Sequence, residues 1–364
     1  MSGDIPAQMQ ALIVKGKSQV QVETVETPKA GPGEILVKVS HVALNPTDWK
    51  GLDLRPNVGA TLGNDYSGTV AATGEGVEGI NVGDRVAGSA IAAQRPGGGA
   101  FAEYHLTNAD GVVALPSSID DAHGANLGVG GMSAYFGLYQ PKHLGLPEPA
   151  RPLKSLPPVD PNFKVLVWSG ATSVGQYAIG FARASGAYVI ATGSAKNHEL
   201  LNSLGASEVY DYHDQQTAEK IAALHPDLTI AYDTFSEKGS QEACARALSK
   251  EKPSKLVIIL PPAPSLSQVN PKVEVDFILL YSVRGEPFEM AGHKFSREYC
   301  QDDRRYLFKM LRGKQGDLYK VLQNGLVKPN HPTVLPGGLA GIPEGLDRLR
   351  KGQVSGEKLT YKIS

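Results

Sequence analysis

The chain has 364 residues and a formal net charge of -1, with 41% hydrophobic and 20% charged residues. This ordinary globular composition provides for two domains with large cores, and no basic run is dense enough to follow a nucleic-acid backbone. The two cysteines, Cys244 and Cys300, are too few for a disulfide framework, which favours a reducing compartment.

No segment has the pattern of a targeting signal or a membrane span. Residues 1–10 carry neither an apolar signal core nor an Arg-rich amphipathic stretch. No uninterrupted apolar run approaches the roughly 20 residues that a spanning helix needs. We therefore expect a cytoplasmic protein without a nucleic-acid or membrane partner.

Residues 9–115 consist of short strand-like segments separated by turns rich in glycine and proline. This spacing predicts an antiparallel, barrel-like β domain. The predicted strands are 11–14, 20–23, 34–44, 67–73 and 84–87.

From residue 163 onward, strand patterns alternate with helical periodicity, which predicts βαβ units and a doubly wound parallel sheet. The proline-rich segment 144–162 is predicted to be a loop that enters this sheet. The predicted strands are 165–168, 187–192, 208–212, 228–232 and 255–260, and the predicted helices are 174–184, 197–204, 216–224 and 240–248.

The C-terminal part is mainly helical and ends in a strand, 358–363, which we expect to return to the first domain. The fold class is therefore α/β, with a β-barrel-type domain and a doubly wound domain. The predicted helices are 304–312, 316–324 and 342–351, and the predicted domains are 1–134, completed by 306–364, and 135–305.

The first βα turn of the second domain has the small residues that a dinucleotide pyrophosphate requires at a helix N-terminus. Gly170 and Gly175 permit close backbone approach, and the hydroxyls of Thr172 and Ser173 add contacts. The turn lacks a full GxGxxG motif, so the alternative is that its glycines serve only tight packing. Its place between a buried strand and a helix favours a cofactor site.

The end of the next strand indicates which cofactor is bound. An NAD enzyme places an acid there against the ribose 2′-hydroxyl, whereas this chain has Ser194 and Lys196 and no acid. A hydroxyl and a cation suit a 2′-phosphate. Tyr212 ends the third strand on the adenosine side. The pattern favours NADPH, although Lys196 alone is equally consistent with a solvated helix start.

Five motifs resemble the medium-chain dehydrogenase/reductase superfamily, and the resemblance covers nearly the whole chain. It implies a GroES-like catalytic domain beside a Rossmann cofactor domain. The motifs are NPTDWK at 45–50, GNDYSGTV at 63–70, VGDRV at 82–86, GAFAEY at 99–104 and GQVSGEK at 352–358.

The zinc ligands of the superfamily's alcohol dehydrogenases are replaced in this chain. Asn45 stands where the first cysteine would be, and Asn64-Asp65 replaces the Gly-His-Glu signature. His105 and His123 would still need a third protein ligand. We therefore expect no metal, and we expect Asn45 and Asp65 to make structural hydrogen bonds.

Within the zinc-free branch, the first two motifs, the SGEKL tail and the proline-rich insert 141–161 look most like stand-alone, trans-acting enoyl reductases of fungal polyketide biosynthesis. This resemblance implies NADPH and an α,β-unsaturated acyl thioester on the acyl carrier domain of a polyketide synthase. The implied cofactor residues are Thr47, Asp48, Lys50, Ala171, Thr172, Ser173, Val174, Ser194, Ala195, Lys196, Asn197, Tyr212, Leu260, Pro261, Val354 and Ser355. The implied acyl-pocket residues are Ala134, Tyr135, Phe136, Gly137, Leu138, Tyr139, Gln140 and Pro141.

Lys50 and Ser133 are the candidate catalytic residues. Lys50 would hold the nicotinamide ribose or face the developing enolate charge, and Ser133 would hydrogen-bond the nicotinamide amide or the substrate carbonyl. Tyr66 is a possible proton donor that is as well explained by packing in a strand. Water is the other source of the α-proton.

Two other functions remain open, namely a quinone or enone reductase for a small free molecule, and a cofactor-binding protein without catalysis. The oligomeric state is open as well. An edge-like strand at 273–281 would allow a homodimer, and a proline-rich loop at 261–271 favours a monomer.

Overall fold

The computed structural model describes residues 4–93, 97–290 and 292–364, so residues 1–3, 94–96 and 291 of the predicted domains lie outside the described part. The chain forms two compact units. The first comprises Met1–Val129, Tyr281–Gln323 and Pro329–Ser364, and the second comprises Gly130–Leu280 and Asn324–Lys328. Residues 281–305 therefore belong to the first unit, although the sequence pattern assigns them to the second domain.

The first unit is built on a mainly antiparallel seven-stranded sheet in the order β16-β17-β3-β4-β5-β7, with β6 paired to β3. A hairpin of β1 and β2 and a second one of β14 and β15 accompany it. The strands are β1 (Gln8–Gly16), β2 (Gln19–Glu26), β3 (Glu34–Ala43), β4 (Asp65–Thr73), β5 (Arg85–Ser89), β6 (Tyr104–Asn108), β7 (Val112–Ala114), β14 (Phe288–Met290), β15 (His293–Phe295), β16 (Pro332–Leu335) and β17 (Lys358–Lys362).

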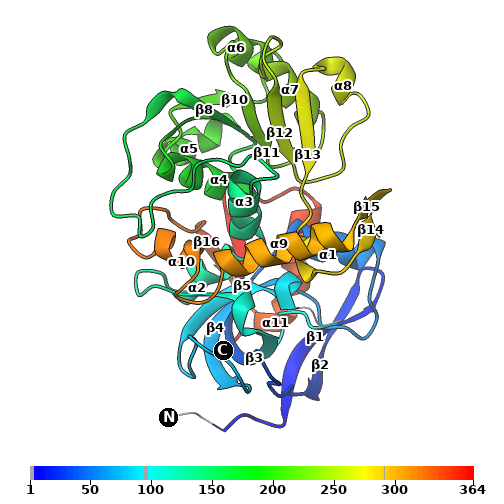
Figure 1. Cartoon of the computed structure of the whole chain (residues 1–364). Helices are drawn as coiled ribbons and strands as arrows, with labels where there is room; N and C mark the ends of the chain where they lie inside the picture. Colours follow the sequence, from blue (N-terminus) through cyan, green and yellow to red (C-terminus); the bar gives the residue numbers. More distant parts are fainter. Residues whose placement is uncertain (1–3, 94–96, 291) are drawn as a thin grey trace. The chain divides into compact units, whose positions relative to one another are not determined.

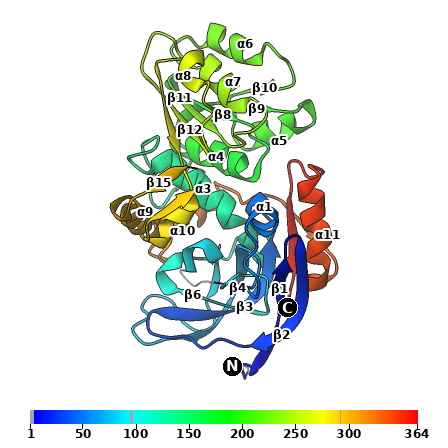
Figure 2. The ribbon, with the colours of Figure 1, turned by 90° about the vertical axis from the view of Figure 1, so that its right-hand side faces the viewer.

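The C-terminal strand returns to this sheet, as the sequence predicts. β17 pairs antiparallel with β3, with Thr360 opposite Ala43 and Lys362 opposite His41. Helix α11 packs on α1 and on the first hairpin of the same unit (Figure 2). The helices of this unit are α1 (Pro46–Leu54), α2 (Asp121–Gly124), α9 (Arg297–Met310), α10 (Asp317–Leu322) and α11 (Gly338–Arg350).

The second unit is a doubly wound α/β structure with a parallel six-stranded sheet in the order β10-β9-β8-β11-β12-β13 (Figure 1). The apolar interiors of its strands are buried on both faces by helices, as parallel sheets require. Its strands are β8 (Asp160–Trp168), β9 (Ala187–Gly193), β10 (Glu208–Asp211), β11 (Ile230–Asp233), β12 (Ser254–Ile258) and β13 (Val273–Phe277). Its helices are α3 (Val129–Tyr139), which begins at the last residue of the first unit's opening segment, α4 (Ser173–Ala184), α5 (His198–Ser203), α6 (Thr217–Leu224), α7 (Ser240–Ala247) and α8 (Leu266–Val269).

The predicted end of the edge strand 273–281 is wrong. β13 lies at the sheet edge as expected, but it ends at Phe277, and a 3₁₀ turn, Leu280–Arg284, follows. The chain leaves the sheet there and joins the first unit at Tyr281.

The proline-rich insert forms a loop that is fixed to its own unit. Arg183 Nη1 donates to the Pro157 carbonyl at 2.7 Å, and Asn324 Nδ2 donates to the Leu153 carbonyl at 2.7 Å. Within the described residues, no helix combines the length and the apolar character that crossing a membrane requires.

Candidate active site

The loops after β8, β9, β10 and β12 carry the predicted cofactor residues of the second unit. Because these strands are parallel, their carboxyl ends share one edge of the sheet, where doubly wound proteins bind nucleotides. The structure therefore brings together, in one unit, four groups that are far apart in the sequence. They are 171–174 after β8, 194–197 after β9, Tyr212 after β10, and Leu260 with Pro261 after β12.

The turn after β8 is shaped for close backbone approach. A Cβ on Gly175 would lie 2.7 Å from the Gly170 Cα and from the Ser169 carbonyl oxygen, so only glycine fits there. Thr172 is the N-cap of α4, and its hydroxyl accepts the Gly175 N–H at 3.0 Å. This hydroxyl thereby satisfies one of the N–H groups that the first turn of α4 leaves without a helical partner.

Thr234, directly after β11, is a residue of this edge that the sequence reasoning missed. Its hydroxyl donates to the Trp168 carbonyl at 2.8 Å and lies 2.9 Å from the Thr172 hydroxyl. Its neighbour Asp233 is buried, which raises the pKa of that carboxyl to about 6, and accepts the Ser240 hydroxyl. The available signal was positional, because Thr234 follows a predicted strand just as Ser194 does.

The loop after β9 presents the residues that were assigned to a 2′-phosphate. Lys196 is exposed, and Ser194 Oγ accepts from Asn197 Nδ2 at 3.1 Å. A carboxylate, Asp211, ends the neighbouring β10. The N–H groups of His213 and Ala195 and the His213 ring hold the pKa of Asp211 below its usual value.

Tyr212 and the loop after β12 border the same edge. The Tyr212 ring is 39% exposed and lies 4.4 Å from the His213 ring. Gln241 holds the last loop, since its Nε2 donates to the Pro261 carbonyl at 3.0 Å and its Oε1 accepts the Ala263 N–H at 2.8 Å.

Helix α3 carries Ser133 and the predicted acyl-pocket residues. The Tyr232 hydroxyl donates to the Ser133 carbonyl at 2.8 Å, which ties α3 to β11. Residues 134–140 are buried, and the Tyr139 hydroxyl donates to the Phe181 carbonyl of α4 at 2.7 Å. Of the predicted acyl-pocket residues, Pro141 alone is exposed.

In the first unit, α1 positions the other candidate residues. The Thr47 hydroxyl lies 3.0 Å from the Tyr281 hydroxyl, and the Lys50 Nζ lies 5.7 Å from the centroid of the Trp49 ring. Tyr281 is a polar neighbour of this site that the sequence reasoning assigned to a strand. Val354, packed on the sheet core, and exposed Ser355 lie in the loop between α11 and β17.

A buried polar cluster lies at the start of α1. Asp48 Oδ2 accepts the Asn45 N–H at 2.7 Å, and Asp48 Oδ1 accepts from Asn64 Nδ2 at 2.6 Å. Lys358 Nζ donates to Asn45 Oδ1 at 2.5 Å and lies 3.3 Å from Asp65 Oδ2. Burial, together with the nearby Asp65 carboxylate, raises the pKa of Asp48 to about 7. Asn45 thus anchors its own turn, and Asp65 makes structural contacts, as predicted.

Three other candidates have local structural roles. Tyr66 is fully buried in the sheet core, and burial raises the pKa of its hydroxyl, which favours packing over proton donation. His105 Nδ1 lies 3.2 Å from the Gly99 carbonyl, and His123 pairs with Asp120. Across 4–93, 97–290 and 292–364, no group of three His, Cys, Asp or Glu side chains is placed to hold a metal.

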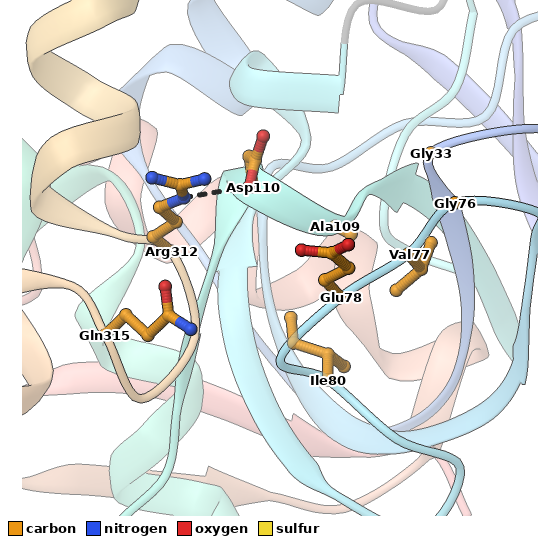
Figure 3. A pocket seen from close by; sticks show the side chains of 9 residues that line it. All are labelled: Gly33, Gly76, Val77, Glu78, Ile80, Ala109, Asp110, Arg312 and Gln315. Atoms are coloured by element: carbon orange, nitrogen blue, oxygen red, sulfur yellow. Dashed lines mark ion pairs between the residues drawn. The ribbon is translucent and has the colours of Figure 1, made fainter.

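A polar hollow of about 150 Å³ lies elsewhere in the first unit (Figure 3). Its charged groups are Glu78, Asp110 and Arg312, and Arg312 Nε lies 3.5 Å from Asp110 Oδ1. None of the nine residues that line it belongs to the predicted site, so we do not place the reaction there.

Comparisons with known proteins agree with this architecture. Residues 31–117 match the family model described as the alcohol dehydrogenase GroES-like domain. The chain is similar along its length to solved structures at low identity, which indicates a shared fold. CurK enoyl reductase has a TM-score of 0.72 at 18% identity, with 98% of this chain and 100% of that chain covered. A mycobacterial protein, Rv1454c, solved with NADPH, has a TM-score of 0.68 at 22% identity, with 97% and 99% covered.

Two sequence relatives define the family. Trans-enoyl reductase caaB of Aspergillus niger is 33% identical over 370 residues, covering 99% of this chain and 98% of the relative. Trans-enoyl reductase thnE of Trichoderma harzianum is 32% identical over 371 residues, covering 100% and 98%. The chain therefore belongs to the trans-enoyl reductases, oxidoreductases of the GroES-like and Rossmann architecture that act on carbon–carbon double bonds.

Proposed function

We propose that the chain is an NADPH-dependent enoyl reductase that transfers hydride to the β-carbon of an α,β-unsaturated polyketide acyl thioester in secondary metabolite biosynthesis. In this proposal the first unit is the catalytic domain and the second holds the cofactor. The observation that carries the proposal is the gathering of the four predicted cofactor loops at the carboxyl edge of the parallel sheet.

The residues present fit a dinucleotide. The Gly170–Gly175 approach leaves room for backbone N–H groups to face a pyrophosphate, and the capped N-terminus of α4 favours an anion. Ser194 and Lys196 supply a hydroxyl and a cation for a 2′-phosphate. The carboxylate of Asp211 is engaged by the N–H groups of Ala195 and His213 within its own loop.

When bound, NADPH supplies the hydride, and the chain orients the reactants and stabilises the negative charge that develops on the thioester oxygen. We propose that the Lys50 ammonium holds the nicotinamide ribose or faces that oxygen. The Ser133 hydroxyl would hydrogen-bond the nicotinamide amide or the thioester carbonyl. Residues 134–141 are our proposal for the wall of the acyl pocket, and solvent completes the reaction by protonating the α-carbon.

Zinc has no part in this proposal. Asn45 and Asp65 stand at positions that carry zinc ligands in alcohol dehydrogenases. Here both of their side chains contact Lys358. A buried ammonium at this place would repel a second cation. We also propose a cytosolic monomer that receives its substrate on the acyl carrier domain of a polyketide synthase.

The test follows NADPH oxidation with a short α,β-unsaturated thioester, with NADH and a simple quinone as parallel reactions. Thioester-dependent turnover that prefers NADPH and survives a chelator supports the proposal. Turnover of the quinone alone would instead assign the chain to the quinone reductases. Lys50→Ala should lower kcat by roughly 100-fold if it acts on the developing charge. Exposed Lys362 on β17 provides a matched control, and Lys362→Ala should leave kcat unchanged.

The cofactor assignment has its own test. Lys196→Ala removes one exposed charged contact, so the Kd of NADPH should rise by about 5- to 20-fold while the Kd of NADH stays constant. Equal weakening for both cofactors would show that Lys196 does not bind the 2′-phosphate.

A further inference from the structure

Lys358 is a buried ammonium that contacts two separate segments of the first unit. Its residue is 3% exposed, and its Nζ contacts Asn45 Oδ1 at 2.5 Å and Asp65 Oδ2 at 3.3 Å. A buried charge is tolerated only when it is paired and hydrogen-bonded, so these contacts hold Lys358 and its partners in one arrangement.

The first partner, Asn45, is the N-cap of α1. Its N–H is accepted by the Asp48 carboxylate, which also binds Asn64. Asn45 is therefore held through its side-chain oxygen by Lys358 and through its backbone N–H by the first turn of α1. Any shift of Asn45 turns the helix that carries Lys50.

The second partner, Asp65, begins β4 and reaches the N-terminus of another helix. Its Oδ1 accepts the N–H of Val129, the first residue of α3, at 2.7 Å. A Cβ on Gly128 would lie 2.1 Å from that oxygen, so the glycine is needed for the approach. Ser133 follows in α3 about one turn later.

We propose that Lys358 is a positioning residue that fixes the N-terminal end of α1 through Asn45 and holds Val129, the residue at which α3 begins, through Asp65. By this means it sets the placement of Lys50 within the first unit. The inference rests on the proposed function for the role of Lys50, but the contacts of Lys358 are independent of it. Its charge, as well as its bulk, is required, because it balances Asp65 in a site that water does not reach.

The experiment compares Lys358→Met with the charge-neutral double variant Lys358→Met/Asp65→Asn in the full-length chain. The single variant leaves a buried carboxylate unpaired, so kcat should fall by about 10- to 100-fold, the effect of a displacement near 1 Å. Its kcat should recover at low pH, where Asp65 takes up a proton. The double variant should lose this recovery at low pH, because no unpaired carboxylate remains, and its kcat at neutral pH should exceed that of the single variant several-fold.

Lys362→Met, an exposed change of the same kind on the same strand, is the matched control and should resemble the wild type. A Lys358→Met enzyme with wild-type kcat and pH profile would overturn the proposal, as would a double variant no better than the single one. Both variants are first shown to be folded by their circular dichroism spectra, and only folded protein is assayed.

Amide hydrogen exchange separates this inference from the proposed function. In Lys358→Met, residues 46–54 and the N–H of Val129 should lose protection by about tenfold or more at temperatures well below melting, even if no substrate has been found. Unchanged protection there refutes the positioning role. A wild-type enzyme that is silent with every thioester refutes the proposed function and leaves the exchange result to decide the role of Lys358.

Discussion

Asp48 should make the first unit less stable as the pH rises, and Asp48→Asn should remove this dependence. The folded carboxyl keeps its proton up to a pKa of about 7, whereas the unfolded chain releases it near 3.8. Between these values the folded state binds more protons, so the free energy of unfolding falls with rising pH, and the loss is complete above pH 7. At about 1.4 kcal/mol per pH unit, the full effect is about 4 kcal/mol.

The asparagine of the variant can keep both contacts of the carboxylate. Its side-chain oxygen accepts the Asn45 N–H, and the Asn64 amide turns so that its oxygen accepts the new N–H. The variant should therefore gain stability over the parent by about 4 kcal/mol between pH 3.5 and pH 8. This gain is a large share of a typical domain's stability.

Urea unfolding followed by tryptophan fluorescence measures the free energy of unfolding of the first unit. The chain has two tryptophans, and Trp168→Phe leaves Trp49, the neighbour of Asp48, as the reporter. Asp53→Asn on the same helix is a control, because it should change the free energy of unfolding in the opposite direction. Arg350 holds the pKa of Asp53 below its usual value, so that variant should lose stability at neutral pH and approach the parent as the pH falls through the lowered pKa.

A difference between Asp48→Asn and its parent that stays within about 0.5 kcal/mol from pH 4 to pH 8 would refute the reasoning. It would mean that Asp48 is ionised throughout, so that the ammonium and the helix N-terminus outweigh its burial.

Three further predictions concern the second unit and the sheet core. Gly175→Ala should destabilise the second unit by about 1–3 kcal/mol and abolish tight NADPH binding, because its Cβ would meet the Gly170 Cα at 2.7 Å. Calorimetry measures the loss of stability, and a titration measures the loss of NADPH binding. Thr234→Val removes the hydroxyl between Trp168 and Thr172 and should raise the Kd of NADPH by about 3- to 10-fold in a fluorescence titration. Tyr66→Phe should leave kcat within about twofold, since the hydroxyl is enclosed in the core; a loss of 100-fold in steady-state rate would restore it as a proton donor.

The sequence pattern was sufficient for the parts of the fold that depend on local periodicity. Alternation and glycine spacing predict the strands of the first unit, and the change to a helical period predicts the parallel sheet. The proposed cofactor edge follows from one further rule, because the carboxyl ends of parallel strands meet whatever their order. Residues 194–197, Tyr212 and Leu260 could therefore be grouped before any strand order was known.

The helices that carry the candidate catalytic residues could not be predicted in the same way. α1 is short and begins with Pro46 after an asparagine, a pattern that also fits a turn. α3 is apolar on all sides, so it has no amphipathic period. The contact of Lys358 with Asp65 depends on which loop β17 passes as it pairs with β3. Tertiary pairing decides that contact, and local preference does not indicate it.

The charges of the buried cluster nearly balance one another. Two carboxylates, Asp48 and Asp65, share the interior with one ammonium, Lys358, which leaves one negative charge in excess. The raised pKa of Asp48 removes much of that excess by retaining a proton near neutral pH. In the proposed reaction the hydride comes from the cofactor, and the charge on the thioester oxygen can be met by Lys50 on the helix that the cluster holds.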